Sequence, residues 1–190
     1  MSKINIGTKA FTQPMPVTLL GTQINKKANF MTLAWVTRIN TNPPLMAVGV
    51  NKVHQTNNGI RNNKTFSINI PSEDMIIETD YCGLVSGKRE NKSNIFDVFY
   101  GELENAPMIM ECPVNIECEL FKVVDLPTND LFIGEVKAVY TEKKYLTDNN
   151  LDIKKINPFT LTMPDNNYWK IGEKVGKAWN VGKKFEGDHE

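Results

Sequence analysis

The segment KANFMTLAWVTRIN, residues 27–40, decides the fold of this chain. Its large apolar side chains recur at a spacing of two, which is the period of a strand with one face against a core. These side chains are Met31, Leu33, Trp35 and Ile39. The alternate row is made of small or polar groups. Such a stripe is typical of a plain core, and the flat surface beside it also suits a flat ligand.

The neighbouring segments predict a three-stranded antiparallel meander. A strand over 17–24 turns back through polar residues into the segment 27–40. Asn42-Pro43-Pro44 breaks the chain, and residues 45–50 return as the third strand. The first half of the chain is therefore expected to be β structure.

The rest of the chain predicts further strands and a few helices. Strands are expected over 66–70, 115–124, 131–141 and 158–163, with a turn over 125–130. Ser72 is expected to cap a helix that ends by Gly83. A brief helix is expected within 149–155 and a short C-terminal helix over 168–179. The whole is predicted to be a mainly β barrel with a few peripheral helices.

Composition indicates an ordinary globular protein with a single domain over residues 1–190. Hydrophobic residues make up 41% of the chain and charged residues 23%, which are values typical of globular domains. The 22 basic and 22 acidic residues cancel, which argues against binding to nucleic acid or to an anionic membrane. The sequence shows neither a membrane-spanning run nor a secretory signal, so we expect a cytoplasmic protein.

The chain has too few cysteines and histidines to suggest a disulfide framework, a metal site or a Ser-His-Asp hydrolase. Cys82, Cys112 and Cys118 are odd in number and lack C-x-x-C spacing, so neither a disulfide framework nor a metal site is expected. Cys118 is expected in the core, whereas Cys82 lies in a Tyr-Cys-Gly turn that suits either a buried or an exposed thiol. The only histidines are His54 and His189, which disfavours a Ser-His-Asp hydrolase.

Residues 51–64, after the third predicted strand, are dense in amide, hydroxyl and cationic side chains. Gly59 and several asparagines make this segment weakly helical at best. Thr56 is predicted to cap a short helix whose free N–H groups face a phosphate. Lys52 and Arg61 are predicted to face the same anion. A phosphate cradle beside the flat face of segment 27–40 suits flavin mononucleotide (FMN).

Several short segments, in their order and spacing, resemble the flavoredoxin and flavin reductase-like proteins of the FMN-binding split-barrel type. They are PVTLLGT at 16–22, residues 29–37, NPPL at 42–45, HQT at 54–56, FSINIPS at 66–72 and YCGLVSG at 81–87. The resemblance extends to residues 168–172. It implies a split β-barrel of Greek-key type, bound FMN and a homodimer with the flavin near the subunit boundary. Tyr168 and Trp169 are candidates for that boundary or for a cofactor lid, or for ordinary packing.

The candidate cofactor ligands combine the residue pattern with this resemblance. They are Asn29, Met31, Thr32, Trp35, Asn51, Lys52, His54, Thr56 and Lys92. Asn29 and Thr32 suit the ring edges, Trp35 suits the ring or ribityl chain, and the resemblance assigns Lys92 to the phosphate. Asn29 and His54 equally suit plain turn positions. Relatives often carry a histidine in the turn that here reads Thr128-Asn129-Asp130.

Three functions fit these residues, and no catalytic residue is assigned. In the first, NADH or NADPH docks transiently over bound FMN, which passes electrons to free flavin or an acceptor protein; no G-x-G-x-x-G follows a strand to hold a nicotinamide cofactor permanently. The second is an FMN electron carrier that serves a redox partner protein, in the manner of flavoredoxin. The third is a barrel without a cofactor.

Overall fold

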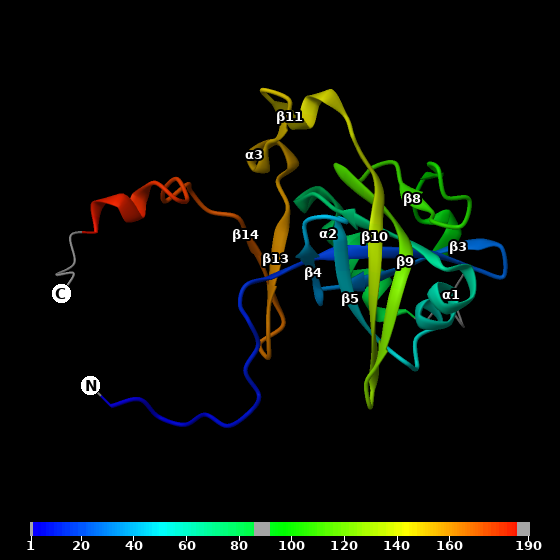
Figure 1. Ribbon diagram of the computed structural model, residues 1–190, viewed down its shortest axis with the longest axis horizontal. Helices are drawn as coiled ribbons and strands as arrows, with labels where there is room; N and C mark the ends of the chain where they lie inside the picture. The colour runs from blue at the N-terminus through cyan, green and yellow to red at the C-terminus, as the bar shows by residue number, and fades with distance from the viewer. Residues whose placement is uncertain (1, 86–91, 186–190) are drawn as a thin grey trace.

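The computed structural model describes residues 2–85 and 92–185, and its main feature is a seven-stranded antiparallel sheet (Figure 1). The strand order is β3-β2-β6-β9-β10-β5-β4. The strands are β2 (Thr18–Ile24), β3 (Lys27–Leu33), β4 (Val36–Asn40), β5 (Leu45–Asn51), β6 (Thr65–Ile70), β9 (Val114–Asp125) and β10 (Asn129–Thr141). The mainly β class predicted from the sequence is confirmed.

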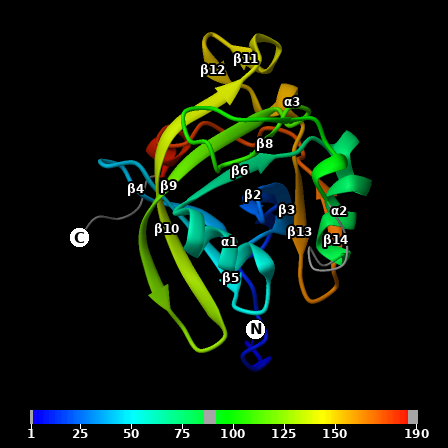
Figure 2. The same cartoon turned by 90° about the vertical axis from the view of Figure 1, so that its right-hand side faces the viewer.

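The sheet closes into a barrel because two consecutive strands lie at its opposite ends. β3 and β4 are the two outermost strands in the order, yet only Ala34 and Trp35 separate them. The sheet must therefore curl until its ends meet, and Figure 2 shows the strands wrapped in this way. A tight turn marks the junction, where the Val36 N–H donates to the Ala34 carbonyl at 3.1 Å. Segment 27–40 thus joins the two ends of the sheet.

The predicted three-stranded meander is wrong in one respect. β2 pairs with β3 and β4 pairs with β5, both antiparallel, but β5 pairs on its other side with β10 instead of continuing from β3. The physical reason is the turn at Ala34, which ends one strand and redirects the next. Periodicity across the segment cannot show this break, because the spacing of apolar side chains continues through it.

Two hydrophobic clusters lie on opposite faces of the sheet. The cluster inside the barrel includes Leu20, Val48, Val50, Ile60, Phe66 and Phe132. The outer cluster includes Leu19, Phe30, Met75, Cys82, Phe96 and Ile109. Leu19 and Leu20 serve different clusters because successive strand residues point to opposite faces. All three cysteines are buried and unpaired, which confirms the core position expected for Cys118.

Helices cover the ends and the outer face of the barrel. They are α1 (Gln55–Asn63), α2 (Ile76–Leu84), α3 (Ile153–Ile156) and the 3-10 turns η1 (Glu73–Met75), η2 (Lys92–Asn94), η3 (Lys143–Tyr145) and η4 (Val181–Lys184). α1 is a regular helix despite its weak propensity, because Ile60 is fully buried and Gly59 allows the helix to pack closely on Thr22. Within the described residues no helix is long and apolar enough to cross a bilayer.

Short strands complete the molecule, and one of them lies where the sequence predicts a C-terminal helix, so that prediction is wrong. The short strands are β1 (Met15–Pro16), β7 (Val98–Phe99), β8 (Met108–Ile109), β11 (Leu146–Thr147), β12 (Asn150–Leu151), β13 (Phe159–Thr162) and β14 (Asn167–Lys170). Residues 168–179 do not form a helix: β14 pairs antiparallel with β13. Pro164 and the left-handed Asn166 (φ 55°) form the turn that reverses the chain. Tyr168 fixes this hairpin to α2 by donating to Asp80 Oδ1 at 2.7 Å.

Candidate functional site

Two adjoining pockets lie where β3, α1 and α2 meet. The inner pocket, about 130 Å³, is lined chiefly by Asn29, His54, Gln55, Thr56, Cys82 and Lys92. The outer pocket, about 340 Å³, is lined among others by Thr32, Trp35, Gly49, Asn51, Asn129 and Met163. Met31, His54 and Gly83 line both pockets. The structure therefore brings together eight of the nine candidate ligands, all except Lys52.

The first turn of α1 forms one wall of the inner pocket. His54 occupies the N-cap position with an extended backbone, and no side chain caps the helix there. Thr56 is thus not the cap that the sequence predicts: it is the second residue of the helix, and its Oγ1 accepts a hydrogen bond from Asn29 Nδ2 at 3.0 Å. The Asn57 N–H donates to the His54 carbonyl at 3.2 Å, which leaves the N–H groups of Gln55 and Thr56 as those of the first turn without a partner inside the helix, and the helix dipole is positive at this end. This wall is suited to an anion.

Lys92 places a cation in the same pocket. Its side chain is only 3% exposed, and its Nζ donates to the carbonyl oxygens of Phe30 at 3.0 Å and Cys82 at 2.7 Å. Burial lowers the pKa of Lys92, and the neighbouring Cys82 acts in the opposite direction. The two carbonyl groups come from β3 and α2, so the ammonium group is held by both elements that flank the pocket. Residues 86–91, which include Lys88 and Arg89, lie outside the described residues.

His54 is the second titratable side chain of the pocket. Burial lowers its pKa below the ordinary value of 6.5, and the positive charge of Lys92 lowers it further. Two groups that can carry positive charge therefore converge on one small pocket. A bound anion would relieve the repulsion between them and favour the protonated imidazole.

The outer pocket offers a flat, largely apolar surface. Trp35 is 49% exposed and its ring lies against Gly49, where an added Cβ would stand 3.4 Å from Trp35 Cε3. The Gly49 N–H donates to the Trp35 carbonyl at 2.9 Å, which fixes the tryptophan backbone to β5. The Thr32 hydroxyl donates to the Thr79 carbonyl, so its oxygen keeps acceptor capacity toward the pocket.

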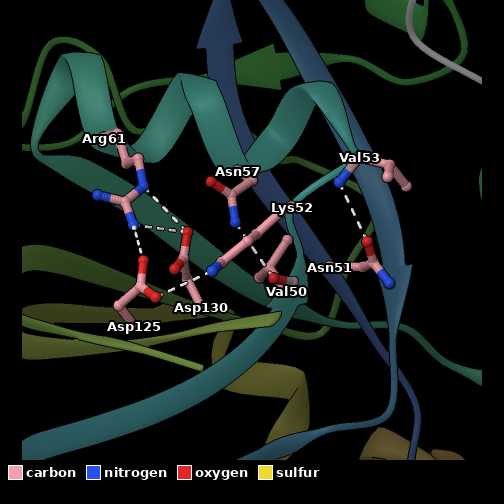
Figure 3. Close-up of polar contacts among 8 residues, drawn as sticks. All are labelled: Val50, Asn51, Lys52, Val53, Asn57, Arg61, Asp125 and Asp130. Atoms are coloured by element: carbon pink, nitrogen blue, oxygen red, sulfur yellow. Dashed lines mark hydrogen bonds and ion pairs between the residues drawn. The ribbon is translucent and has the colours of Figure 1, made fainter. Parts of the chain in front are cut away.

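Lys52 and Arg61 are not part of either pocket, because acidic side chains at the β9–β10 turn hold them (Figure 3). Lys52 Nζ lies 3.0 Å from Asp125 Oδ1, and Arg61 lies 2.7 Å from the buried Asp130. Asn51 does reach the outer pocket, but its Oδ1 already accepts from the Val53 N–H at 3.0 Å. The sequence shows Asp125 and Asp130 only as turn residues, so this competition for the cations cannot be predicted from it.

Sequence reasoning missed several residues that line the pockets. Gln55 and Gly83 line the inner pocket, and Gly49, Asn129 and Met163 line the outer one. Asn129 lies in the segment 128–130, for which the family resemblance implies a histidine near the flavin, and this segment does reach the outer pocket. Gly83 shows why small residues matter here: an added Cβ would lie 3.3 Å from Thr32 Cβ, so glycine lets α2 approach β3. No pattern within the sequence marks these contacts.

The residues present fit an FMN molecule. Among the described residues that line the two pockets there is no carboxylate, and the inner pocket collects helix N–H groups, a lysine, a histidine and a threonine. This donor set suits a phosphate, which favours several donors at once. The outer pocket supplies a flat aromatic and aliphatic surface with a few polar groups, which suits a flavin ring. Cys82 is no reactive thiol in this setting, because burial raises its pKa to about 11.

Comparison with known proteins places this fold in a family. A family model described as "Flavin reductase like domain" matches residues 11–160. The crystal structure of a flavoredoxin from Methanosarcina acetivorans is similar with 52% identity and a TM-score of 0.95, covering 96% of this chain and 98% of that one. A flavoredoxin of Desulfovibrio vulgaris (Miyazaki F) is similar with 31% identity and a TM-score of 0.88, covering 95% and 100%.

A further relative matches over a shorter region. An uncharacterized protein of Archaeoglobus fulgidus is 29% identical over 116 residues, which are 60% of this chain and 66% of that protein, just under two thirds of its length. The family model and the two flavoredoxin structures cover most of this chain. The chain therefore belongs to the flavin reductase-like family.

Proposed function

We propose that this protein binds FMN and carries electrons through it. The observation that carries the proposal is the convergence of Lys92, His54 and the first turn of α1 on one small pocket that opens toward an aromatic, flat one. The phosphate is assigned to the inner pocket and the flavin ring to the outer pocket. The 52% identity to a flavoredoxin supports the same assignment.

The residues of the chain have binding and positioning roles in this proposal. Lys92 and the α1 N–H groups hold the phosphate, with His54 as a further donor when it is protonated. Asn29 orients Thr56 through their 3.0 Å hydrogen bond, and Thr32 and Asn51 face the ring or ribityl chain from the outer pocket. Trp35 covers apolar ring surface. FMN, when bound, supplies the redox chemistry itself.

We prefer the electron carrier to an enzyme that oxidises a nicotinamide, because two structures with 52% and 31% sequence identity to this chain are flavoredoxins. The second candidate is an NADH- or NADPH-dependent reductase that passes electrons to free flavin or an acceptor protein. It is favoured by Trp35, whose 49% exposure at the outer pocket leaves room for a nicotinamide to approach a bound ring.

We further propose a homodimer, a redox partner protein and a cytoplasmic location, the last because all three cysteines are unpaired.

The visible absorption spectrum of the purified chain tests this proposal. After addition of FMN and removal of the excess by gel filtration, we expect flavin absorption bands to stay with the protein. Under anaerobic conditions, bleaching by dithionite but not by NADH or NADPH supports the carrier, whereas bleaching by either nicotinamide supports the reductase. A chain that stays colourless would overturn the proposal and leave a barrel without a cofactor.

A further inference from the structure

The last described residues, 171–185, form an arm that leaves the barrel after β14 (Figure 1). Its apolar side chains are exposed to an unusual degree: Val175 is fully exposed, Trp179 is 94% exposed and Phe185 is 77% exposed. Isolated exposed apolar residues are common, but a row of them on one projecting segment marks an interaction surface. The arm therefore carries contacts that its own chain does not fill.

The arm has a defined conformation, because several contacts within the chain hold it. At its base, Lys154 Nζ donates to the Gly172 carbonyl at 3.2 Å and pairs with Glu173 at 3.1 Å. Near its end, the Val181 N–H donates to the Lys177 carbonyl at 3.1 Å, and Val181 covers Gly176 so closely that a Cβ there would lie 2.7 Å from Val181 Cγ1. This folded turn presents Trp179 outward, in a left-handed backbone conformation (φ 56°) that tryptophan seldom adopts.

A large apolar pocket, hereafter the docking pocket, offers a matching surface. It measures about 870 Å³ and is lined among others by Pro14, Trp35, Val36, Leu126, Pro127 and Leu131. No described residue that lines it is charged. It adjoins the outer pocket, with which it shares Trp35, Gly49 and Asn129. Whatever fills the docking pocket therefore also borders the proposed flavin site.

The arm's own geometry favours a second copy as the occupant. Figure 1 shows the arm directed away from the barrel, on the same side as the N-terminal segment. That segment supplies Pro14 to the docking pocket. Residues 171–177 contain no helix or turn, and because extended chain spans about 3.3 Å per residue, this part of the arm carries Trp179 well away from the barrel and toward a neighbouring molecule. Two copies related by a two-fold axis can exchange arms reciprocally, which closes the assembly.

We propose that the arm of one copy docks in the docking pocket of a second copy, with Trp179 as its anchor. Each buried aromatic side chain contributes about 150–250 Å². Two arms with their aromatic and valine anchors, together with the pocket surfaces that they cover, approach the area of about 1,600 Å² that is typical of a stable interface. The inference rests on the homodimer in the proposed function and deepens it, because each arm adds residues beside the other copy's flavin site.

Disulfide trapping between two different variants, each with one added cysteine, tests the docking in the full chain. Lys177→Cys marks the arm and Thr128→Cys marks the rim of the docking pocket, and both positions are exposed. The native cysteines are buried and do not interfere. On mild oxidation of a mixture, we expect a disulfide-linked pair containing one chain of each variant. The control replaces Thr128→Cys by Asn58→Cys, on the exposed face of α1, and should give no linked pair.

A sedimentation measurement provides the second test. The full chain should sediment as a dimer, and Val175→Ser with Trp179→Ser should weaken the dimer at least tenfold while leaving the circular dichroism spectrum of the monomer unchanged, since both side chains are exposed in a single copy. The proposal is overturned if the wild-type chain is a monomer, or if Val175→Ser with Trp179→Ser leaves the dimer unchanged. It is also overturned if a chain that carries both Lys177→Cys and Thr128→Cys forms only an intramolecular disulfide. Flavin absorption separates the two claims: a monomer that retains FMN refutes the arm exchange alone, and a colourless arm-exchanged dimer refutes the function alone.

Discussion

Lys92 holds an ammonium group almost completely out of solvent, where it donates hydrogen bonds to the carbonyl oxygens of Phe30 and Cys82. Burying a charge without a counter-charge is costly, and carbonyl groups offset that cost only in part. Among the residues that the structure describes, no carboxylate pairs with Lys92, and a phosphate in the inner pocket would provide a negative charge. At the scale of single residues, this lysine is therefore the strongest argument for an anion site.

Lys92→Met is expected to weaken FMN binding by about 10- to 100-fold, because a hydrogen bond to a charged group contributes about 1.5–3 kcal/mol. Quenching of flavin fluorescence during titration measures the dissociation constant. Lys52→Met is the matched control, since Lys52 pairs with Asp125 outside both pockets, and it should bind FMN as the wild type does. Equal losses in the two variants would contradict the assignment.

His54 is expected to respond to the cofactor through its pKa. Without ligand, burial and Lys92 keep that pKa below 6.5, and a bound phosphate should raise it. The chain has only two histidines, so proton NMR can follow both, and His189→Gln identifies the signal of His54. A titration midpoint that stays unchanged on addition of FMN would place the phosphate elsewhere.

The same lowered pKa predicts how stability depends on pH. Unfolded His54 takes up a proton more readily than folded His54, so the unfolded state gains protons first as pH falls. His54 should therefore destabilise the ligand-free protein progressively below pH 6.5. Urea unfolding of the wild type and of His54→Gln between pH 7.5 and 5 measures this contribution. A free energy of unfolding that falls more steeply with decreasing pH in the variant than in the wild type would contradict the prediction.

At the scale of elements, the sequence predicts what depends on local pattern. The strands over 66–70, 115–124 and 131–141 follow from alternating side chains, and the structure confirms them within a few residues. At α1 the sequence predicts a short helix but places its cap at Thr56 instead of His54, and its propensity does not show that α1 is regular over Gln55–Asn63. The break at Ala34 could not be predicted, because it depends on partners distant in the chain. Gly59 lowers helix propensity, yet its contact with Thr22 is what docks the helix.

Gly59→Ala tests this account of α1. In an isolated helix the change is worth about 1 kcal/mol in favour of alanine. Here the new Cβ would meet Thr22 Cγ2 at 2.6 Å and the Gln23 carbonyl at 3.0 Å, so we expect destabilisation by about 1–3 kcal/mol. Urea unfolding measures it, with Asn58→Ala on the exposed side of the same helix as control. Stabilisation of Gly59→Ala would refute the close contact.

The Arg61–Asp130 pair should matter for stability rather than for FMN. Burial acts to raise the pKa of Asp130, but hydrogen bonds from Arg61 and Asn57 outweigh it, so the pKa lies below 3.8. The stabilisation is therefore present above pH 3.8 and is lost as pH falls through the folded value. Arg61→Met should cost about 1–3 kcal/mol at pH 7 by leaving a buried carboxylate without its cation. Lys137→Met, which removes the surface ion pairs to Glu119 and Glu135, is the control and should not change the unfolding midpoint.

At the scale of the whole molecule, the site is assembled from parts that are far apart in the sequence. β3 and the junction after it provide the flat surface, α1 provides the helix N-terminus, and Lys92 enters from η2. The residue pattern and the family resemblance together identify most of these residues individually, and Lys92 rests on the resemblance. Their convergence follows only from the curl of the sheet, and so does the exclusion of Lys52 by the β9–β10 turn.

The central claim is that the inner pocket holds the phosphate of FMN, and riboflavin, which lacks only that phosphate, tests it most directly. The measurement is the ratio of the riboflavin and FMN dissociation constants for the wild-type chain. At least two charge-assisted contacts to the phosphate predict that FMN binds about a hundredfold or more tightly than riboflavin. This preference should shrink in Lys92→Met. Equal affinities for the two flavins would contradict the account.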